Sequence, residues 1–366
     1  EVFGPDHWQT ARSSYFVAKT NYQADRLEDA ERIASSTLET AIPTLGKSHP
    51  EVVLLHNMLA FIAQHQDQPS AAEAHFRDAL SGSELGLGAG HDTTMMIRRN
   101  FSEFLASQGK DEGAVRLAHI VRKFGLEAAA DPHPDPMYLA KVSFFLSSAT
   151  LEAARDYEAA LALAERAVEA SRGRWYYPWV ALSEAHFRRG ELDEAISAQR
   201  RALSLPDGLH YAGEESYLVR LFTENGDLEA AEEFLHEHLK RRRAARPDGD
   251  PLLGHSHALL GRVLLAQGRT AEAVVELRNA LTIYDLQLPE DHEWHITVLS
   301  DLGAALTTDD AFDDAGRLLE QAKRLASTAD GPRASEDLAL IEERLAALVM
   351  RRRAAPQGAT AAMPVP

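Results

Sequence analysis

The stretch that most resembles a site for chemistry is Ala41 to Ser48, whose sequence A-I-P-T-L-G-K-S matches a loose phosphate-binding loop with Ala in place of the first Gly. Such a loop holds phosphates with backbone N–H groups, and it needs a β-strand before it and a helix after it. Here a helical pattern precedes the stretch and no second acidic strand follows. We therefore interpret it as a linker and predict no nucleotide or other cofactor.

The histidines are the next candidates, because imidazole is a common metal ligand. Four of them follow one another at three equal steps of 42 residues: His7, His49, His91 and His133. Ligands must converge on one ion, whereas copies spaced this way lie one per repeat, so we expect these histidines to stop helices at their N-termini. His236 with His238, and His255 with His257, are two residues apart and point in different directions on a helix. We predict no metal site.

Composition narrows the classes of function further. The chain of 366 residues has no cysteine and no Gly-x-Ser-x-Gly motif, so neither a thiol nor a serine nucleophile of that type is available, and we expect no enzyme activity. The net charge of −18 opposes binding to a nucleic-acid backbone. The basic run from Lys240 to Asp250 is expected to be a solvated loop. No apolar run is long enough to span a membrane and no signal sequence opens the chain, so we expect a cytoplasmic protein without membrane or nucleic-acid partners.

Helical elements must position whatever side chains do act. From Trp179 to Leu205 the apolar spacing predicts two short amphipathic helices with a break at Gly190. The alanine that begins the second helix of such a pair, the register alanine, recurs along the chain at Ala30, Ala72, Ala114, Ala160, Ala195, Ala231, Ala273 and Ala315.

Two further positions repeat with this register. Twelve residues before the register alanine the side chain is small in seven of eight cases: Ala18, Ala60, Ser102, Ser148, Ser183, Val219, Gly261 and Gly303. Helices that cross closely need small side chains where their backbones approach. Residues that break helices lie just before each register alanine: Asp25, Asp67, Gly109, Asp156, Gly190, Gly226, Gly268 and Asp310. These patterns predict eight helix pairs.

The motif at Trp179 to Ala202 resembles the tetratricopeptide repeat signature W-x2-L-G-x2-Y then A-x3-F, with Ser, His and Gln in place of Gly, Tyr and Phe. The linker Leu45 to Val52 (L-G-K-S-H-P-E-V), with Asn57 to Ala60 (N-M-L-A) and the 42-residue spacing, is similar to the kinesin-light-chain type of this repeat. That likeness covers repeats one to three and, more weakly, seven and eight. It implies an all-α fold, an α-α superhelix or solenoid of about eight helix pairs.

We expect this array to occupy residues 1–353. The repeats are predicted near 8–42, 50–84, 92–125, 136–172, 177–206, 211–243, 251–286 and 293–328. A one-sided apolar stripe predicts a capping helix at 335–353, and 354–366 is expected to be a disordered tail. Because the chain begins at Glu1 inside a linker-like segment, we expect it to be the C-terminal array of a longer bacterial protein.

The resemblance implies that first helices line a concave groove that holds a peptide. The non-core positions of these helices give the binding candidates Lys19, Asn57, Phe61, Arg99, Asn100, Tyr217, Arg220 and Arg262, and Tyr22 and Glu184 occupy such positions too. Asn bonds a peptide backbone through both donor and acceptor, and Arg clamps a carboxylate. We prefer the set Asn57, Arg99 and Asn100, because adjacent repeats bring them onto one surface; the alternative is that each is an ordinary solvated side chain.

The sequence thus predicts a non-catalytic scaffold whose partner is a protein or peptide. The alternative is the regulatory or substrate-recruiting region of a larger signalling enzyme, such as a bacterial Ser/Thr protein kinase, to which arrays of this kind are often joined. The identity of the partner and the oligomeric state do not follow from the residues.

Overall fold

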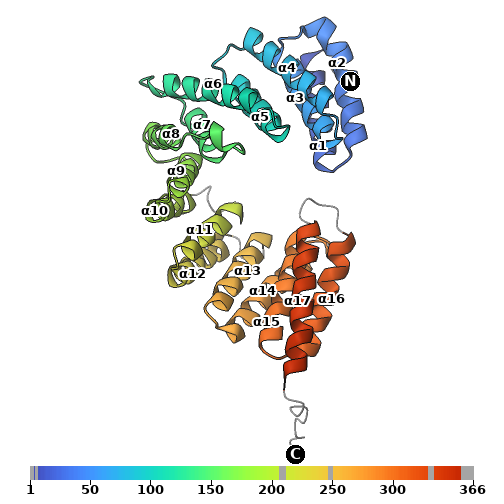
Figure 1. The fold of residues 1–366 in the computed structure, drawn as a ribbon, viewed down its shortest axis with the longest axis vertical. Coiled ribbons are helices and arrows are strands. Elements are labelled where there is room, and N and C mark those ends of the chain that lie inside the picture. The colour runs from blue at the N-terminus through green and yellow to red at the C-terminus, as the bar shows by residue number, and fades with distance from the viewer. Residues whose placement is uncertain (1–3, 5–6, 206–211, 246–249, 329–333, 356–366) are drawn as a thin grey trace, which may run out of the picture. The chain divides into compact units, whose positions relative to one another are not determined.

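The chain is all-α in the computed structural model, which describes residues 4, 7–205, 212–245, 250–328 and 334–355 (Figure 1). Seventeen α-helices and one short 3₁₀ helix lie in these residues. They form two compact units, residues 1–198 and 199–366. Within residues 8–188 and within residues 212–354, helices that are neighbours in the sequence pack against one another, so the predicted helix-pair fold is confirmed.

Unit 1 consists of the first nine helices, the 3₁₀ helix and the start of the tenth. Their bounds are α1 Trp8–Gln23, α2 Leu27–Leu45, α3 Pro50–His65, α4 Pro69–Gly86, α5 Asp92–Ser107, α6 Asp111–Ala129, α7 Pro136–Ser148, η1 Glu152–Ala154, α8 Tyr157–Ala170 and α9 Tyr176–Arg188, with α10 Leu192–Ser204 crossing the border between units. A helix and not a strand precedes the phosphate-loop-like residues, as predicted, and this helix also includes their first part, Ala41 to Leu45, before it ends at Gly46.

Unit 2 contains the remaining seven helices. They are α11 Ala212–Glu224, α12 Leu228–Ala245, α13 Pro251–Ala266, α14 Thr270–Gln287, α15 Glu293–Thr308, α16 Phe312–Thr328 and α17 Ala334–Ala354. The last of these packs on both α15 and α16 and has no partner helix after it in the described residues, which confirms the predicted capping helix. The predicted tail lies outside the described residues from position 356 onward.

The predicted helix breaks lie at turns with left-handed backbone. Seven of the eight have positive φ, the exception being Asp156: Asp25, Asp67, Gly109, Gly190, Gly226, Gly268 and Asp310. Gly adopts this conformation without a Cβ penalty, and Asp tolerates it better than most residues. The break residues therefore fix where each first helix ends.

Histidine caps the N-terminus of four helices in the described residues. The Nδ1 atom of His49 accepts a hydrogen bond from the backbone N–H of Glu51 at 3.3 Å, which satisfies one of the free donors at the start of α3. His7, His91 and His292 cap α1, α5 and α15 in the same way. The linker histidines thus stop helices, as predicted, except that Asp135 rather than His133 caps α7.

Small residues lie where paired helices cross. The hydroxyl of Ser183 donates to the carbonyl of Ala195 at 2.8 Å, and Ser102 bonds Ala114 in the same way at 2.9 Å. A Cβ atom added to Gly303 would lie only 2.6 Å from Cγ of the fully buried Leu319. These contacts explain the repeated small side chain twelve residues before the register alanine.

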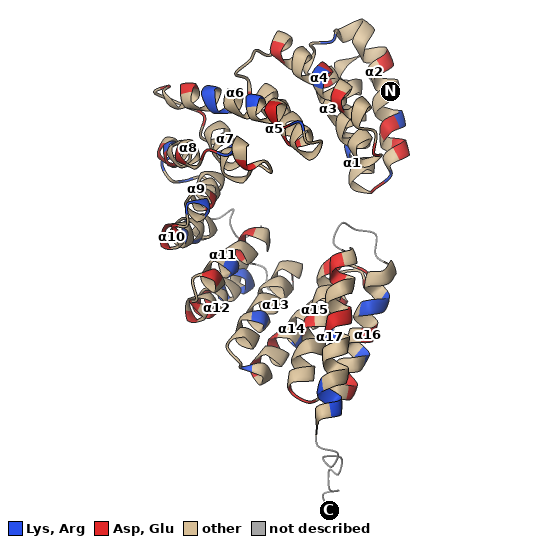
Figure 2. Ribbon diagram, in the orientation of Figure 1, with Lys and Arg blue, Asp and Glu red and all other residues tan. Residues whose placement is uncertain are grey.

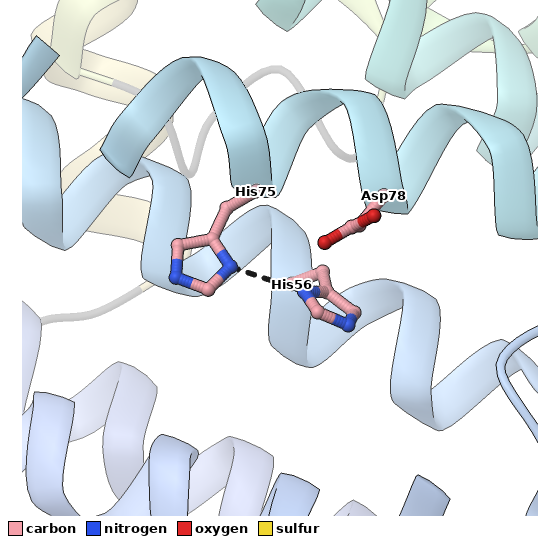
Figure 3. A group of neighbouring side chains, drawn as sticks. All are labelled: His56, His75 and Asp78. Atoms are coloured by element: carbon pink, nitrogen blue, oxygen red, sulfur yellow. Dashed lines mark hydrogen bonds between the residues drawn. The ribbon is translucent and has the colours of Figure 1, made fainter. Parts of the chain in front are cut away.

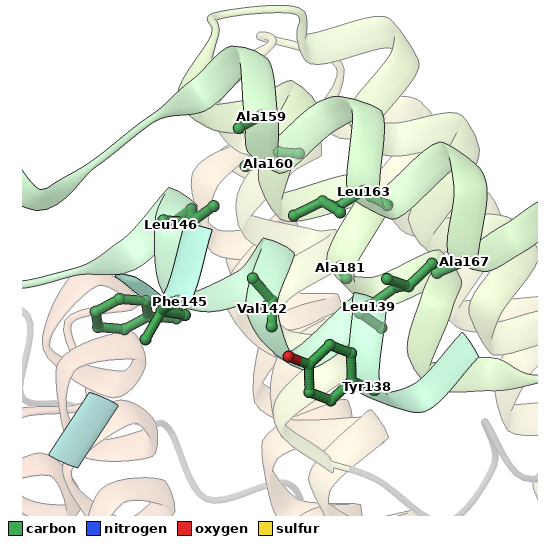
Figure 4. Packing of buried hydrophobic residues seen from close by; sticks show 14 of the residues in the cluster. Tyr138, Leu139, Val142, Phe145, Leu146, Ala159, Ala160, Leu163, Ala167 and Ala181 are labelled. Carbon is green, nitrogen blue, oxygen red and sulfur yellow. The ribbon is translucent and has the colours of Figure 1, made fainter. Parts of the chain in front are cut away.

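Repeat four departs from this register. Ser143, seventeen residues before Ala160, bonds its carbonyl at 2.7 Å, so the predicted position Ser148 is wrong. The reason is an insertion after α7 that contains η1. Asp156 lies after this insertion and caps α8 instead of taking the left-handed conformation. Around this repeat, Leu139, Val142 and Leu163 join one buried cluster (Figure 4).

The basic run at Lys240 is not a loop up to Ala245, because α12 continues to that residue. Two of its arginines form hydrogen bonds within unit 2. Arg242 donates to the buried carboxylate of Glu215 at 2.9 Å, and Arg241 donates to the carbonyl of Leu203 at 3.1 Å. Residues 246–249 lie outside the described part of the chain. The expectation of a solvated loop was therefore wrong for the residues that the structure describes.

Candidate binding surfaces on the first helices

Two of the preferred candidates meet between adjacent repeats. The side-chain nitrogen of Asn100 on α5 donates to the side-chain oxygen of Asn57 on α3 at 3.2 Å. Asn57 is 6% exposed and Asn100 is half-buried. No further side-chain hydrogen bond of either amide occurs within the described residues. The pair therefore retains the NH2 group of Asn57 and the carbonyl oxygen of Asn100 for a further partner.

Arg99 lies beside this pair in sequence, but its guanidinium reaches into the next repeat. It donates to the backbone carbonyl of Lys141 on α7 at 2.9 Å. Burial lowers the pKa of Arg99, although nearby Tyr177 and Asp92 oppose the shift. Lys141 in turn forms an ion pair with Asp92 at 2.8 Å. Successive first helices α3, α5 and α7 are thus joined by polar side chains.

The other candidates in unit 1 do not join this group. Lys19 on α1 is exposed. Phe61 on α3 is half-buried and meets the fully buried ring of Phe76 edge-on, with ring centroids 5.6 Å apart. Glu184 on α9 is buried and accepts a hydrogen bond from Arg188 at 2.6 Å. Phe61 therefore packs as part of the core.

A pocket of about 290 Å³ lies on the first helices of unit 2. Its wall comes from α11, α13, α14, α15 and α17, and it includes one sequence candidate, Arg262: the lining residues are Ser216, His255, Ala258, Arg262, Tyr284, Glu293, Trp294, Thr297 and Asp337. First helices α11, α13 and α15 contact one another in succession, and α17 contacts α15.

The polar groups of this pocket are held in place by one another. The hydroxyl of Ser216 lies 2.8 Å from Nε2 of His255, whose ring packs on Trp294 at 4.9 Å between centroids. Arg262 is bonded to the buried Asp301 at 2.6 Å, and this carboxylate raises the pKa of Arg262. The pocket thus combines an aromatic wall with fixed donors and acceptors.

The candidates Tyr217 and Arg220 lie on α11 but do not line this pocket. The guanidinium of Arg220 stacks over the ring of Tyr217 at 5.0 Å. The sequence interpretation missed Ser216, His255 and Trp294. The sequence does contain a pattern that could have identified Ser216, because it lies fifteen residues before its register alanine, as do the candidates Asn57 and Arg99.

A larger hollow of about 730 Å³ lies at the turn before α12 and includes Arg269. That guanidinium donates to Glu232 and to Glu272, both at 2.6 Å, so its charge is already paired. Acidic and basic residues are interspersed on the helices of both units (Figure 2). None of the helices in the described residues combines the length and apolar character that crossing a membrane requires.

Three solved structures illustrate what comparison with known structures finds. A tetratricopeptide repeat protein from Parabacteroides merdae is 15% identical, with a TM-score of 0.42, over 81% of this chain and 99% of that one. BtubC from P. vanneervenii is 15% identical, with a TM-score of 0.41, over 74% and 94%. The apo form of RapI is 14% identical, with a TM-score of 0.47, over 82% and 88%.

Three segments of the chain match sequence models described as tetratricopeptide repeats: residues 57–92, 177–198 and 256–328. They cover α3 to α4, α9 to the start of α10, and α13 to α16. The matches therefore fall in both units. No curated protein matches the chain significantly in sequence.

Proposed function

We propose that this chain, which belongs to the tetratricopeptide repeat family, is a non-catalytic cytoplasmic scaffold that binds a peptide or protein partner across its first helices. The observation that supports this most is the amide pair of Asn57 and Asn100. Its NH2 group and carbonyl oxygen match the acceptor and donor of an extended peptide backbone. Arg99 is next to Asn100 in the sequence, and its guanidinium, which donates to the carbonyl of Lys141 on the next repeat, is a further candidate for a carboxylate of the partner.

The pocket of unit 2 is proposed to receive one side chain of the partner. Arg262 pairs with Asp301, and two acidic residues, Glu293 and Asp337, also belong to the lining. The wall also includes the aromatic rings of Tyr284 and Trp294. A Lys or Arg side chain, with an apolar stem and a cationic head, fits this combination best. Lys19 on α1, and Tyr217 and Arg220 on α11, remain further candidates for contact with the partner, because α1 and α11 are also first helices.

A displayed library of random peptides, selected on the immobilised chain, tests the unit 1 surface. Selected peptides are then measured by fluorescence anisotropy against the double variant Asn57→Ala, Asn100→Ala. Loss of two hydrogen bonds is expected to weaken binding about 10- to 30-fold. Arg99→Ala is expected to weaken peptides that carry a carboxylate more than those that do not.

The matched control is Arg32→Ala on the second helix α2, where the exposed Arg32 pairs with the exposed Asp29. It should leave every affinity unchanged. If the double variant binds all selected peptides as tightly as the natural chain, the amide pair is not the binding surface. If no peptide is selected at all, the peptide-scaffold proposal itself fails.

A further inference from the structure

Three side chains with metal-binding atoms converge between the two helices of repeat two. The Nδ1 atoms of His56 on α3 and His75 on α4 are 3.1 Å apart. One ligand atom from each ring and one carboxylate oxygen of Asp78 all lie within 4.8 Å of one another. His75 and Asp78 are three residues apart on one helix and so share a face. Figure 3 shows the rings and the carboxylate close together between α3 and α4.

The separation of the two nitrogens suits a metal ion. Zinc binds imidazole nitrogen at about 2.0–2.1 Å, so two tetrahedral ligand atoms lie about 3.3 Å apart. A direct hydrogen bond between two neutral rings gives the same distance, and titration with metal distinguishes the two. No hydrogen bond joins Asp78 to either ring within the described residues. The carboxylate of Asp78 is exposed, so a rotation of its side chain brings it closer at little cost.

The surroundings of both rings disfavour the charged form of imidazole. Burial lowers the pKa of His56, and the nearby His75 and Lys47 lower it further, against the opposing effect of Asp78. Burial also lowers the pKa of His75, against Asp78 and Glu31. His56 is 9% exposed and is held by a helix that is largely buried.

Repeat seven provides an internal comparison. His257 and Glu276 occupy the register positions of His56 and His75, sixteen residues before and three after the register alanine. There the Nδ1 atom of His257 lies 2.5 Å from the carboxylate of Glu276, and its Nε2 atom lies 3.0 Å from Arg243. That histidine is fully engaged in a His–carboxylate pair. Repeat two instead has a second imidazole and places the carboxylate one turn further along the helix.

We propose that His56, His75 and Asp78 bind a divalent transition-metal ion of the Zn²⁺ class. Two imidazoles and one carboxylate suit Zn²⁺, Co²⁺ and Ni²⁺, and three protein ligands leave one coordination position for water or for a donor from a partner. The ion fastens α3 to α4 near the amide pair of Asn57. This site goes beyond the scaffold function and does not depend on it.

Titration of the chelator-treated, tag-free chain with Zn²⁺ alone, followed by calorimetry, tests the site. Co²⁺ serves as a second probe, because a tetrahedral site gives it visible absorption. One equivalent is expected to bind. His75→Ala should raise Kd about 100-fold and Asp78→Asn about 10-fold, because each removes or weakens one ligand. His75 and Asp78 are at least partly exposed, so replacing them disturbs the fold less than replacing the buried His56 would. Circular dichroism verifies the helical content of both variants.

The matched control is His257→Gln, which alters the equivalent histidine of repeat seven. It should bind one equivalent with unchanged Kd and unchanged Co²⁺ absorption. The proposal is overturned if the natural chain does not bind one equivalent of Zn²⁺. It is equally overturned if His75→Ala and Asp78→Asn bind the ion as tightly as the natural chain does.

Discussion

Arg262 donates a hydrogen bond to the buried carboxylate of Asp301 at 2.6 Å, and the two residues lie on the first helices of adjacent repeats. The other oxygen of Asp301 accepts from Arg344 on the capping helix at 2.7 Å. One carboxylate, 4% exposed, thus joins α13, α15 and α17. It also holds the arginine that lines the unit 2 pocket.

Asp301→Ala is therefore expected to destabilise unit 2. Removing the carboxylate leaves two guanidinium groups without their shared partner, one of them half-exposed, so the free energy of unfolding should fall by about 2–3 kcal/mol. Urea unfolding followed by circular dichroism measures the change. Asp314→Ala is the control, because its pair with Arg317 is exposed on both sides and should contribute less than about 0.5 kcal/mol. Equal effects of the two substitutions would contradict the role of Asp301.

Gly303→Ala is expected to lower stability, although alanine is the better helix former. Its Cβ would lie 2.6 Å from Cγ of Leu319, and the resulting overpacking should cost about 1–3 kcal/mol. Gly316→Ala on α16 is the control, since its Cβ would meet only Leu348 at an ordinary 3.6 Å. That substitution should raise the free energy of unfolding by about 0.5–1 kcal/mol. Thermal and urea midpoints that shift in the same direction for both variants would refute the close-approach argument.

His238 is expected to make stability depend on pH. It lies seven residues after the register alanine Ala231, at a position where five of the eight repeats have alanine. Burial, with Arg242, Arg241 and His255 beside it, lowers the pKa of His238 to about 3. Below about pH 6.5 the histidine takes up a proton in the unfolded chain but not in the folded chain. The contribution of His238 to the free energy of unfolding is therefore present above about pH 6.5 and lost as the pH falls. Relative to His238→Ala, the natural chain should lose about 2 kcal/mol between pH 8 and pH 5.

The comparison with His238→Ala is essential because of the adjacent Glu215. Burial raises the pKa of Glu215, although Arg242 opposes this shift, so the contribution of Glu215 to stability depends on pH in the opposite direction. Nε2 of His238 lies 3.7 Å from the carboxylate of Glu215, so the two groups interact, and the same pair of proteins is also compared with Glu215→Gln present in both. Urea unfolding at pH 8, 6.5 and 5 supplies the free energies. A constant difference across this range would show that His238 is not buried as a neutral ring.

Asp67 tests the turns. Its φ of 55° is accessible to Asp and Gly but costly for a β-branched residue. Asp67→Val should lower the free energy of unfolding by about 1–2 kcal/mol, whereas Asp67→Gly should not lower it. A calorimetric scan that gives the same Tm for both variants would show that the left-handed turn does not fix the end of α3.

Local patterns predicted the helix pairs and, in seven of the eight repeats, the left-handed turn that ends the first helix. Left-handed turns such as those at Asp67 and Gly190 depend on the backbone preference of one residue, and the small residue at Ser183 depends on one crossing of two consecutive helices. Such constraints act within a single repeat, so they recur in the sequence at a fixed register. The small residue of repeat four was predicted at the wrong position because an insertion moves the helix crossing to Ser143.

Contacts between helices were settled only by the tertiary structure. The sequence identified Asn57, Asn100 and Arg262 as side chains of first helices, but not that the two amides bond or that Asp301 holds the arginine. The sequence did not predict that His56 meets His75, nineteen residues away, or that Lys240 to Ala245 is helical. The sequence alone determined the helical pairs because their constraints are local and periodic. The tertiary structure decided the sites because side chains on different helices meet according to how the helices pack, which no spacing within one helix encodes.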